Sequence, residues 1–146
     1  MVESHRSGTG PLDRRPEGVD DATVSAVGKV GEAFEAVEVV RGHLYALHRL
    51  SGTADLTLGE AVAQLREAGH HELADRLDTE LVGRNVLAGR WTFQVVEEYD
   101  DGYYADFRRL EADVREELVA GRRHVYEAEM KADRRTDGRP GHEQAP

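Results

Sequence analysis

The sequence predicts an all-α domain, a bundle-like arrangement of four or five helices with two long ones and a disordered tail at each end. Apolar residues recur every three or four positions over most of residues 20–132, which is the spacing of one helix face. No two segments qualify as a pair of strands. Residues 1–19 and 133–146 are rich in Gly, Pro and Arg without this spacing and are predicted to be the tails, which leaves a single domain between them.

The first long helix is predicted over residues 21–50, where the apolar spacing is most regular. Its apolar face consists of Val24, Val27, Val30, Phe34, Val37, Val40, Leu44 and Leu47. Gly28, Gly31 and Gly42 each cost about 1 kcal/mol relative to Ala in a helix interior, unless they let a neighbouring helix approach closely. Ser51-Gly52 is predicted to end this helix.

Two shorter helices are predicted next. Thr57 and Glu60 have the spacing of a capping box, so a helix is expected over residues 58–68, with Gly69 as its stop. A further helix is predicted over residues 71–82, ended near Gly83, because its leucines lie four residues apart. These leucines are Leu73, Leu77 and Leu81.

The last long helix is predicted to begin after Gly102 and to continue to about Met130. Its apolar positions are Phe107, Leu110, Val114, Leu118 and Val125. The segment before it, residues 84–99, is ambiguous, because residues 91–96 are rich in β-favouring residues. A lone strand would leave its backbone groups unpaired, so a helix is favoured there.

Composition excludes several classes of function. The chain has 146 residues with 29 acidic and 19 basic side chains, a formal charge of −10, which argues against nucleic-acid binding. It has no cysteine, which excludes disulfides, thiolate zinc sites, iron–sulfur clusters and a cysteine nucleophile. No apolar run approaches the 18 to 20 residues of a membrane span. Without the apolar core of a signal peptide at its start, the protein is expected to be cytoplasmic.

Residues 91–107 combine six of the nine aromatic residues with five acidic residues and no Lys or Arg. Rings provide contact area and carboxylates attract cations, so this segment could bind another protein, a second copy of the chain or a small cationic ligand. The alternative is that the rings are core residues and the acids favour a helix N-terminus. The best functional interpretation is a small acidic helical interaction protein that uses residues 84–107. The candidate binding residues are Arg84, Asn85, Arg90, Trp91, Glu97, Glu98, Tyr99, Asp101, Tyr103 and Tyr104.

A second hypothesis concerns two carboxylate pairs with a spacing of three residues. Glu35 and Glu38 lie on the first long helix, and Glu72 and Asp75 lie on the helix predicted at residues 71–82. This Glu-x-x-Glu and Glu-x-x-Asp pattern resembles the all-α nucleoside triphosphate pyrophosphohydrolases of the MazG-like class. The resemblance implies that the four carboxylates would bind Mg²⁺ and position a nucleotide for hydrolysis. No cofactor is predicted outside this alternative.

Overall fold

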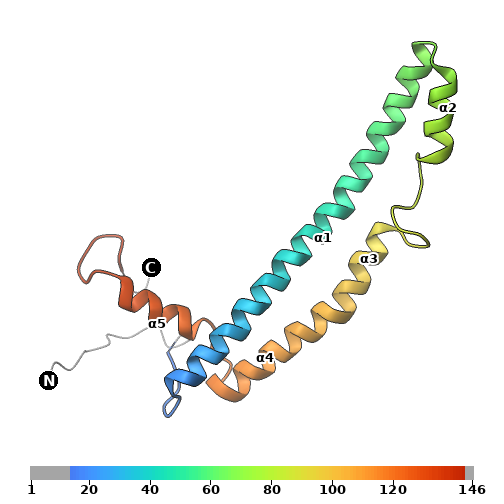
Figure 1. Ribbon diagram of the computed structural model, residues 1–146. Coiled ribbons are helices and arrows are strands. Elements are labelled where there is room, and N and C mark those ends of the chain that lie inside the picture. The colour runs from blue at the N-terminus through green and yellow to red at the C-terminus, as the bar shows by residue number, and fades with distance from the viewer. Residues whose placement is uncertain (1–13, 144–146) are drawn as a thin grey trace. The chain divides into compact units, whose positions relative to one another are not determined.

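The computed structural model describes residues 14–143 and shows an all-α chain (Figure 1). Within these residues there is no β-strand, which confirms the predicted fold class. The outermost parts of both predicted tails, residues 1–13 and 144–146, lie outside the described residues. None of the helices formed by residues 14–143 combines the length and the hydropathy that crossing a membrane requires.

Five α-helices and one π-helical segment follow one another in the described chain. They are α1 (Asp21–Glu67), α2 (His71–Glu80), α3 (Thr92–Tyr99), η1 (Asp100–Tyr104), α4 (Ala105–Val119) and α5 (Val125–Arg134). The chain forms two compact units. The first combines the residues up to Ala36 with those from Asp106 onward, and the second is Val37–Ala105. Helix α1 contributes to both units.

Helix α1 is longer than the sequence predicts, with 47 residues. It begins after Asp20, whose side chain accepts a hydrogen bond from the Thr23 N–H at 2.8 Å, the geometry of a helix N-cap. The predicted stop at Ser51-Gly52 is wrong, because Gly52 lies within the helix and is not among the residues with positive φ. The separate helix at 58–68 is also wrong, since Thr57 lies inside α1. A glycine costs only about 1 kcal/mol there, less than a broken helix face would.

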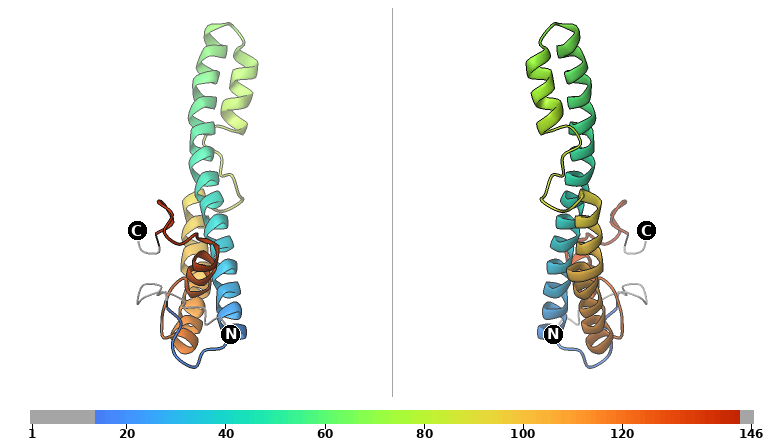
Figure 2. Two further views of the ribbon diagram at one scale, coloured as in Figure 1. Left: turned by 90° about the vertical axis from the view of Figure 1, so that its left-hand side faces the viewer. Right: turned by 90° about the vertical axis from the view of Figure 1, so that its right-hand side faces the viewer.

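Helix α2 folds back along the end of α1, as both sets of views show (Figures 1 and 2). The turn contains Gly69 with φ +88°, a left-handed conformation that glycine adopts without strain, so the predicted stop is confirmed. The Arg66 guanidinium near the end of α1 forms ion pairs with Asp75 and Asp78 of α2. The helix predicted at 71–82 is therefore present as α2.

The second long helical segment differs from the prediction at both ends. It starts at Thr92, ten residues before Gly102, and runs without a loop through α3, η1 and α4 to Val119. The helix favoured for residues 84–99 is therefore confirmed only over Thr92–Tyr99, which form α3; it is wrong for residues 84–91, which form a loop that turns at Gly89, with φ +74°. The predicted continuation to Met130 is wrong, because the chain turns at Gly121, with φ +70°. Glycine fits this turn because it adopts positive φ without the strain that a side chain would bring.

The core of the first unit is small and made of valines. Val24 and Val27 of α1 pack with Val119 of α4 and Val125 of α5, and all four are buried. The Phe34 and Phe107 rings extend this contact, stacked with their centroids 5.9 Å apart. Because valine is short, the helices must approach closely for these side chains to meet.

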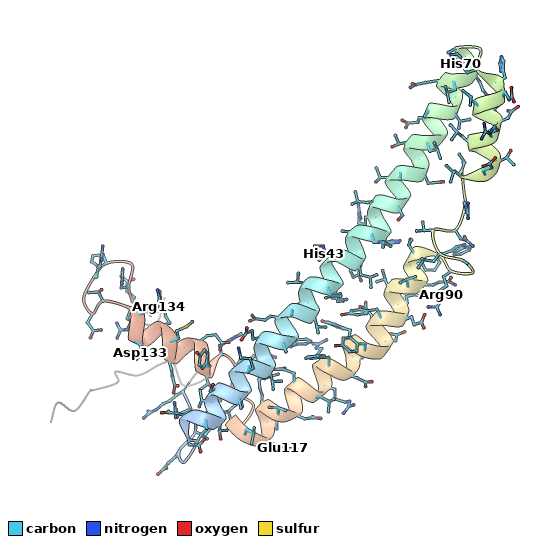
Figure 3. All side chains as sticks on the ribbon, in the orientation of Figure 1. His43, His70, Arg90, Glu117, Asp133 and Arg134 are labelled. Atoms are coloured by element: carbon cyan, nitrogen blue, oxygen red, sulfur yellow. The ribbon has the colours of Figure 1, made fainter. Side chains whose placement is uncertain are left out.

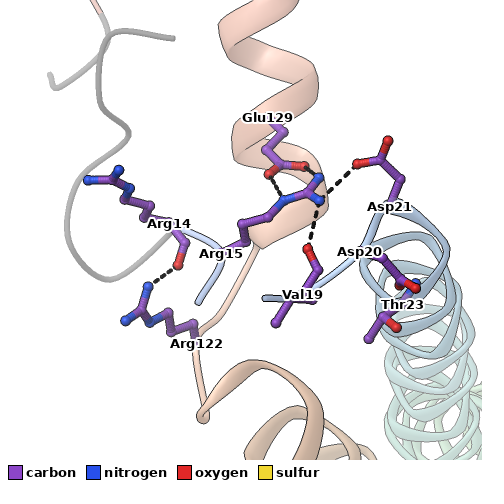
Figure 4. Close-up of polar contacts among 8 residues, drawn as sticks. All are labelled: Arg14, Arg15, Val19, Asp20, Asp21, Thr23, Arg122 and Glu129. Atoms are coloured by element: carbon purple, nitrogen blue, oxygen red, sulfur yellow. Dashed lines mark hydrogen bonds and ion pairs between the residues drawn. The ribbon is translucent and has the colours of Figure 1, made fainter. Parts of the chain in front are cut away.

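Residues 14–19, part of the predicted N-terminal tail, are attached to α5 by a polar contact (Figure 4). The Arg15 guanidinium donates two hydrogen bonds to the Glu129 carboxylate, at 2.6 and 2.8 Å, and one to the Val19 carbonyl at 3.1 Å. Arg15 also forms an ion pair with Asp21 at 2.8 Å. The hydrogen bond with Glu129 raises the pKa of Arg15 above its usual value. This paired guanidinium joins the start of α1 to α5.

Gly28 lies where α5 approaches α1, and Gly31, on the same helix without such a neighbour, serves as its control. A Cβ at Gly28 would lie 2.9 Å from Cβ and Cγ of Tyr126, whereas one at Gly31 would have no neighbour within 4 Å. We expect Gly28→Ala to lower the free energy of unfolding by about 1–2 kcal/mol, because overpacking outweighs the gain in helix propensity. Gly31→Ala should raise it by about 1 kcal/mol. Urea unfolding followed by circular dichroism measures both, and equal stabilisation by the two changes would contradict the close contact.

Candidate partner-binding surface

The segment that the sequence singles out for binding, residues 84–107, consists of a loop followed by α3, η1 and the start of α4. The loop is attached to α1 at its first residues, where the Gly83 N–H donates a hydrogen bond to Asp55 at 2.7 Å. At the other end of the loop, the Trp91 N–H donates to the Gln94 side chain at 2.9 Å, which stabilises the start of α3. The loop is therefore anchored at both ends within the second unit.

One side of α3 and η1 packs on α1 through an ion pair between Arg41 and Asp100. The guanidinium donates to both carboxylate oxygens, at 2.8 and 3.1 Å. Its Cζ lies 4.6 Å from the Tyr104 ring centroid and 5.2 Å from that of Tyr45. Hydrogen bonding by Arg41 lowers the pKa of Asp100 below its usual value. A cation of the chain itself thus already contacts one ring and one acid of the segment that the sequence offers to a small cationic ligand, Tyr104 and Asp100.

Two tyrosines predicted to bind a partner contact α1 instead. The Tyr104 hydroxyl donates a hydrogen bond to Glu38 at 2.7 Å, and the Tyr99 hydroxyl donates to the Val37 carbonyl at 3.4 Å. Burial raises the pKa of Tyr99 above its usual value. Near the start of α3, His48 Nδ1 and the Thr92 hydroxyl are 2.8 Å apart. These contacts hold η1 and α3 against α1.

The loop and the start of α3 leave large apolar side chains in solvent. We call Val86, Leu87, Trp91 and Phe93 the aromatic surface; all four are exposed, Trp91 with 57% of its surface. The Trp91 and Phe93 rings contact each other, with centroids 5.2 Å apart and planes at 59°. Tyr103 in η1 is also exposed, at 60%. Exposed aromatic rings that contact each other are typical of the centre of a protein interface.

Acidic side chains border the aromatic surface. Glu97 lies one turn after Phe93, Asp101 lies one turn further, and both are exposed without an ion pair within the described chain. Glu98, also exposed, forms an ion pair with Arg90, which Figure 3 labels in the loop. Arg84 and Asn85, at the start of the loop, are exposed as well. The polar residues proposed from the sequence are therefore exposed in the same segment as the aromatic surface, as the polar residues of an interface rim would be.

The structure does not bring together the carboxylate pairs of the metal hypothesis. Glu35 and Glu38 lie near the middle of α1, whereas Asp75 of α2 forms an ion pair with Arg66, 28 residues after Glu38 on the same helix. That separation is about 42 Å along the helix axis, far beyond what one Mg²⁺ can bridge. Glu72 lies on α2 with Asp75. Nowhere in residues 14–143 do three or more His, Asp or Glu side chains form a group that could hold a metal ion.

Three members of the aromatic surface are absent from the sequence-based set of candidates. One signal in the sequence indicates them: Val86, Leu87 and Phe93 are apolar residues in or next to a loop. Two glycines with positive φ, Gly83 (+73°) and Gly89 (+74°), mark this loop.

Comparison with known protein families, with curated proteins and with solved structures finds no match to this chain. The residues and their geometry are therefore the basis for a functional proposal.

Proposed function

We propose that this chain is a cytoplasmic protein-binding module that holds another protein against the aromatic surface. The observation that carries the proposal is the exposure of the Trp91 and Phe93 rings together with Val86 and Leu87. Large exposed apolar side chains that gather within one short segment are a common mark of a protein interaction site. Tryptophan is also the residue type most enriched at energetically important interface positions.

The border of the aromatic surface determines the chemistry of the partner. Glu97 and Asp101 carry negative charge one and two turns after Phe93, and the whole chain has a charge of −10. A partner segment with an apolar side chain flanked by Lys or Arg would fit the rings and pair with both carboxylates. The same charge supports a protein rather than a nucleic acid as the partner.

A peptide library tests the proposal, because it samples many sequences and the proposal specifies the partner's side-chain chemistry but not its sequence. We expect a library of random peptides displayed on phage to enrich sequences that place Lys or Arg beside an apolar residue. Trp91 is the only tryptophan, so its fluorescence reports binding directly. Replacing it removes a candidate hot spot, so Trp91→Ala should weaken the best peptide at least tenfold, measured by calorimetry.

A matched control separates binding from folding. Leu73 of α2 is exposed to a similar degree as Trp91 but lies outside the aromatic surface, so Leu73→Ala should leave peptide affinity unchanged. Because Trp91 is largely in solvent, Trp91→Ala should change the free energy of unfolding by less than about 0.5 kcal/mol. The proposal is refuted if the library does not enrich basic–apolar peptides. It is also refuted if wild type and Trp91→Ala bind the best peptide with equal affinity.

A further inference from the structure

Helix α1 has a second apolar face, distinct from the aromatic surface. We call it the outer stripe, and its residues are Val40, His43, Leu47, Leu50, Ala54, Thr57 and Ala61. Val40, Leu47 and Leu50 are exposed, Leu50 with 66% of its surface, and Val39 beside them is exposed as well. In Figure 3 the labelled His43 side chain points away from α3. The side of α1 that packs within the second unit, through Val37, Arg41 and His48, is a different one.

The outer stripe has the spacing of a coiled-coil seam. Its seven residues follow one another at alternating intervals of three and four, from Val40 to Ala61. A seam with this 3.5-residue period faces one partner helix along its length when that helix has the same period. A second copy of α1 meets this requirement by definition, and it brings the same apolar residues to the contact.

Charge also favours a second copy at this face. The chain carries −10, so two copies repel each other over most of their surface. Residues 39–61 are neutral, with Arg41 and Arg49 balanced by Asp55 and Glu60. Arg41 and Asp55 are moreover engaged within the chain, by Asp100 and by the Gly83 N–H. We infer that the outer stripe binds the outer stripe of a second copy, which forms a homodimer.

The side-chain sizes select an antiparallel arrangement. In a parallel pair in register, His43 would meet His43 and Ala54 would meet Ala54, which places two imidazoles together and leaves a void between two small residues. In an antiparallel pair with Leu47 opposite Leu50, His43 lies opposite Ala54 and Val40 opposite Thr57. The large His43 side chain then meets the small Ala54, while the Leu47–Leu50 and Val40–Thr57 pairs join side chains of similar size, so neither two imidazoles nor two alanines face each other.

The size of the contact predicts a weak dimer. A helix segment of 22 residues is about 33 Å long and about 10 Å wide, so two facing stripes cover about 660 Å² before their ridged surfaces are counted. Interfaces at the low end of the size range are transient. We expect a Kd on the order of 10 µM.

Sedimentation equilibrium of the full chain, over concentrations from well below to well above that Kd, measures the association. Leu50→Glu places a charge in the seam and should raise Kd at least tenfold. Leu56→Glu is the matched control, because Leu56 is exposed on the same helix outside the stripe and its replacement should leave Kd unchanged. A monomer at every concentration, which would mean that other residues or another partner cover the stripe, overturns the inference. So does an equal effect of both variants.

Crosslinking tests the orientation, and the absence of cysteine from the chain removes any background. When His43→Cys chains are mixed with Ala54→Cys chains, the antiparallel pair should form mainly the mixed disulfide. A disulfide between two His43→Cys chains would overturn the antiparallel arrangement. Trp91→Ala should leave dimerisation unchanged, so this test fails or succeeds independently of the proposed partner binding.

Discussion

Replacing Val119 by aspartate is expected to lower the free energy of unfolding of the first unit by more than about 4 kcal/mol. Val119 is completely buried, at 0% exposure, and the other buried side chains of this core, among the described residues, are Val24, Val27 and Val125. A carboxylate there would have no cationic partner in that apolar core. It would also lie at the last residue of α4, where the helix dipole disfavours negative charge.

Leu118→Asp is the control for this change. Leu118 is the preceding residue of α4 and is exposed, so the same carboxylate stays hydrated there and should cost about 1 kcal/mol or less. Hydrogen exchange of the α1, α4 and α5 amides, together with urea unfolding, measures both variants. If Val119→Asp costs no more than Leu118→Asp, the valine cluster is not the core of this unit.

The sequence predicts the helical fold well because helix periodicity is a local property. It fails at Ser51-Gly52, where a local stop signal competes with a longer pattern. The positions that face inward in the second unit, among them Leu44, His48 and Asp55, continue at intervals of three and four through Ser51. Two of these positions are polar and make side-chain contacts, so a search for apolar residues alone does not detect the continuous face.

The break between α4 and α5 shows the opposite limitation. Apolar residues keep helical spacing from Val114 through Leu118 to Val125, yet the chain turns at Ala120 and Gly121. Ala120 adopts φ +54°, which costs about 1–2 kcal/mol and which no propensity predicts. The turn lets both Val119 and Val125 enter one core, a tertiary gain that only the folded chain reveals.

The binding residues divide in a way that local sequence does not show. The acids and rings of residues 91–107 look equivalent, but Asp100 and Tyr104 contact α1 while Trp91 and Glu97 remain in solvent. The deciding partner, Arg41, lies 59 positions before Asp100. Contacts between residues so far apart in the sequence depend on how the helices pack. The sequence therefore locates the segment but does not show which of its side chains face α1 and which face solvent.

Arg41→Ala is expected to detach η1 from α1 and to lower the melting temperature of the second unit by on the order of 10 °C. The change removes both hydrogen bonds to Asp100 and the contacts of the guanidinium with Tyr45 and Tyr104. It also leaves the Asp100 carboxylate, 24% exposed, without this cation. Arg49→Ala, on an exposed position two turns further along α1, is the control and should shift the melting temperature by roughly 2 °C or less.

The pH dependence of this difference identifies its cause. Since Arg41 lowers the pKa of Asp100, the ion pair stabilises the fold fully above the unfolded-state pKa of about 3.9 and loses this effect as pH falls through the lower folded-state pKa. The melting temperatures of wild type and Arg41→Ala should therefore differ most at neutral pH and converge in acid. A constant difference down to low pH would assign the effect to packing of the Arg41 side chain on the rings, since cation–π contacts do not titrate in this range.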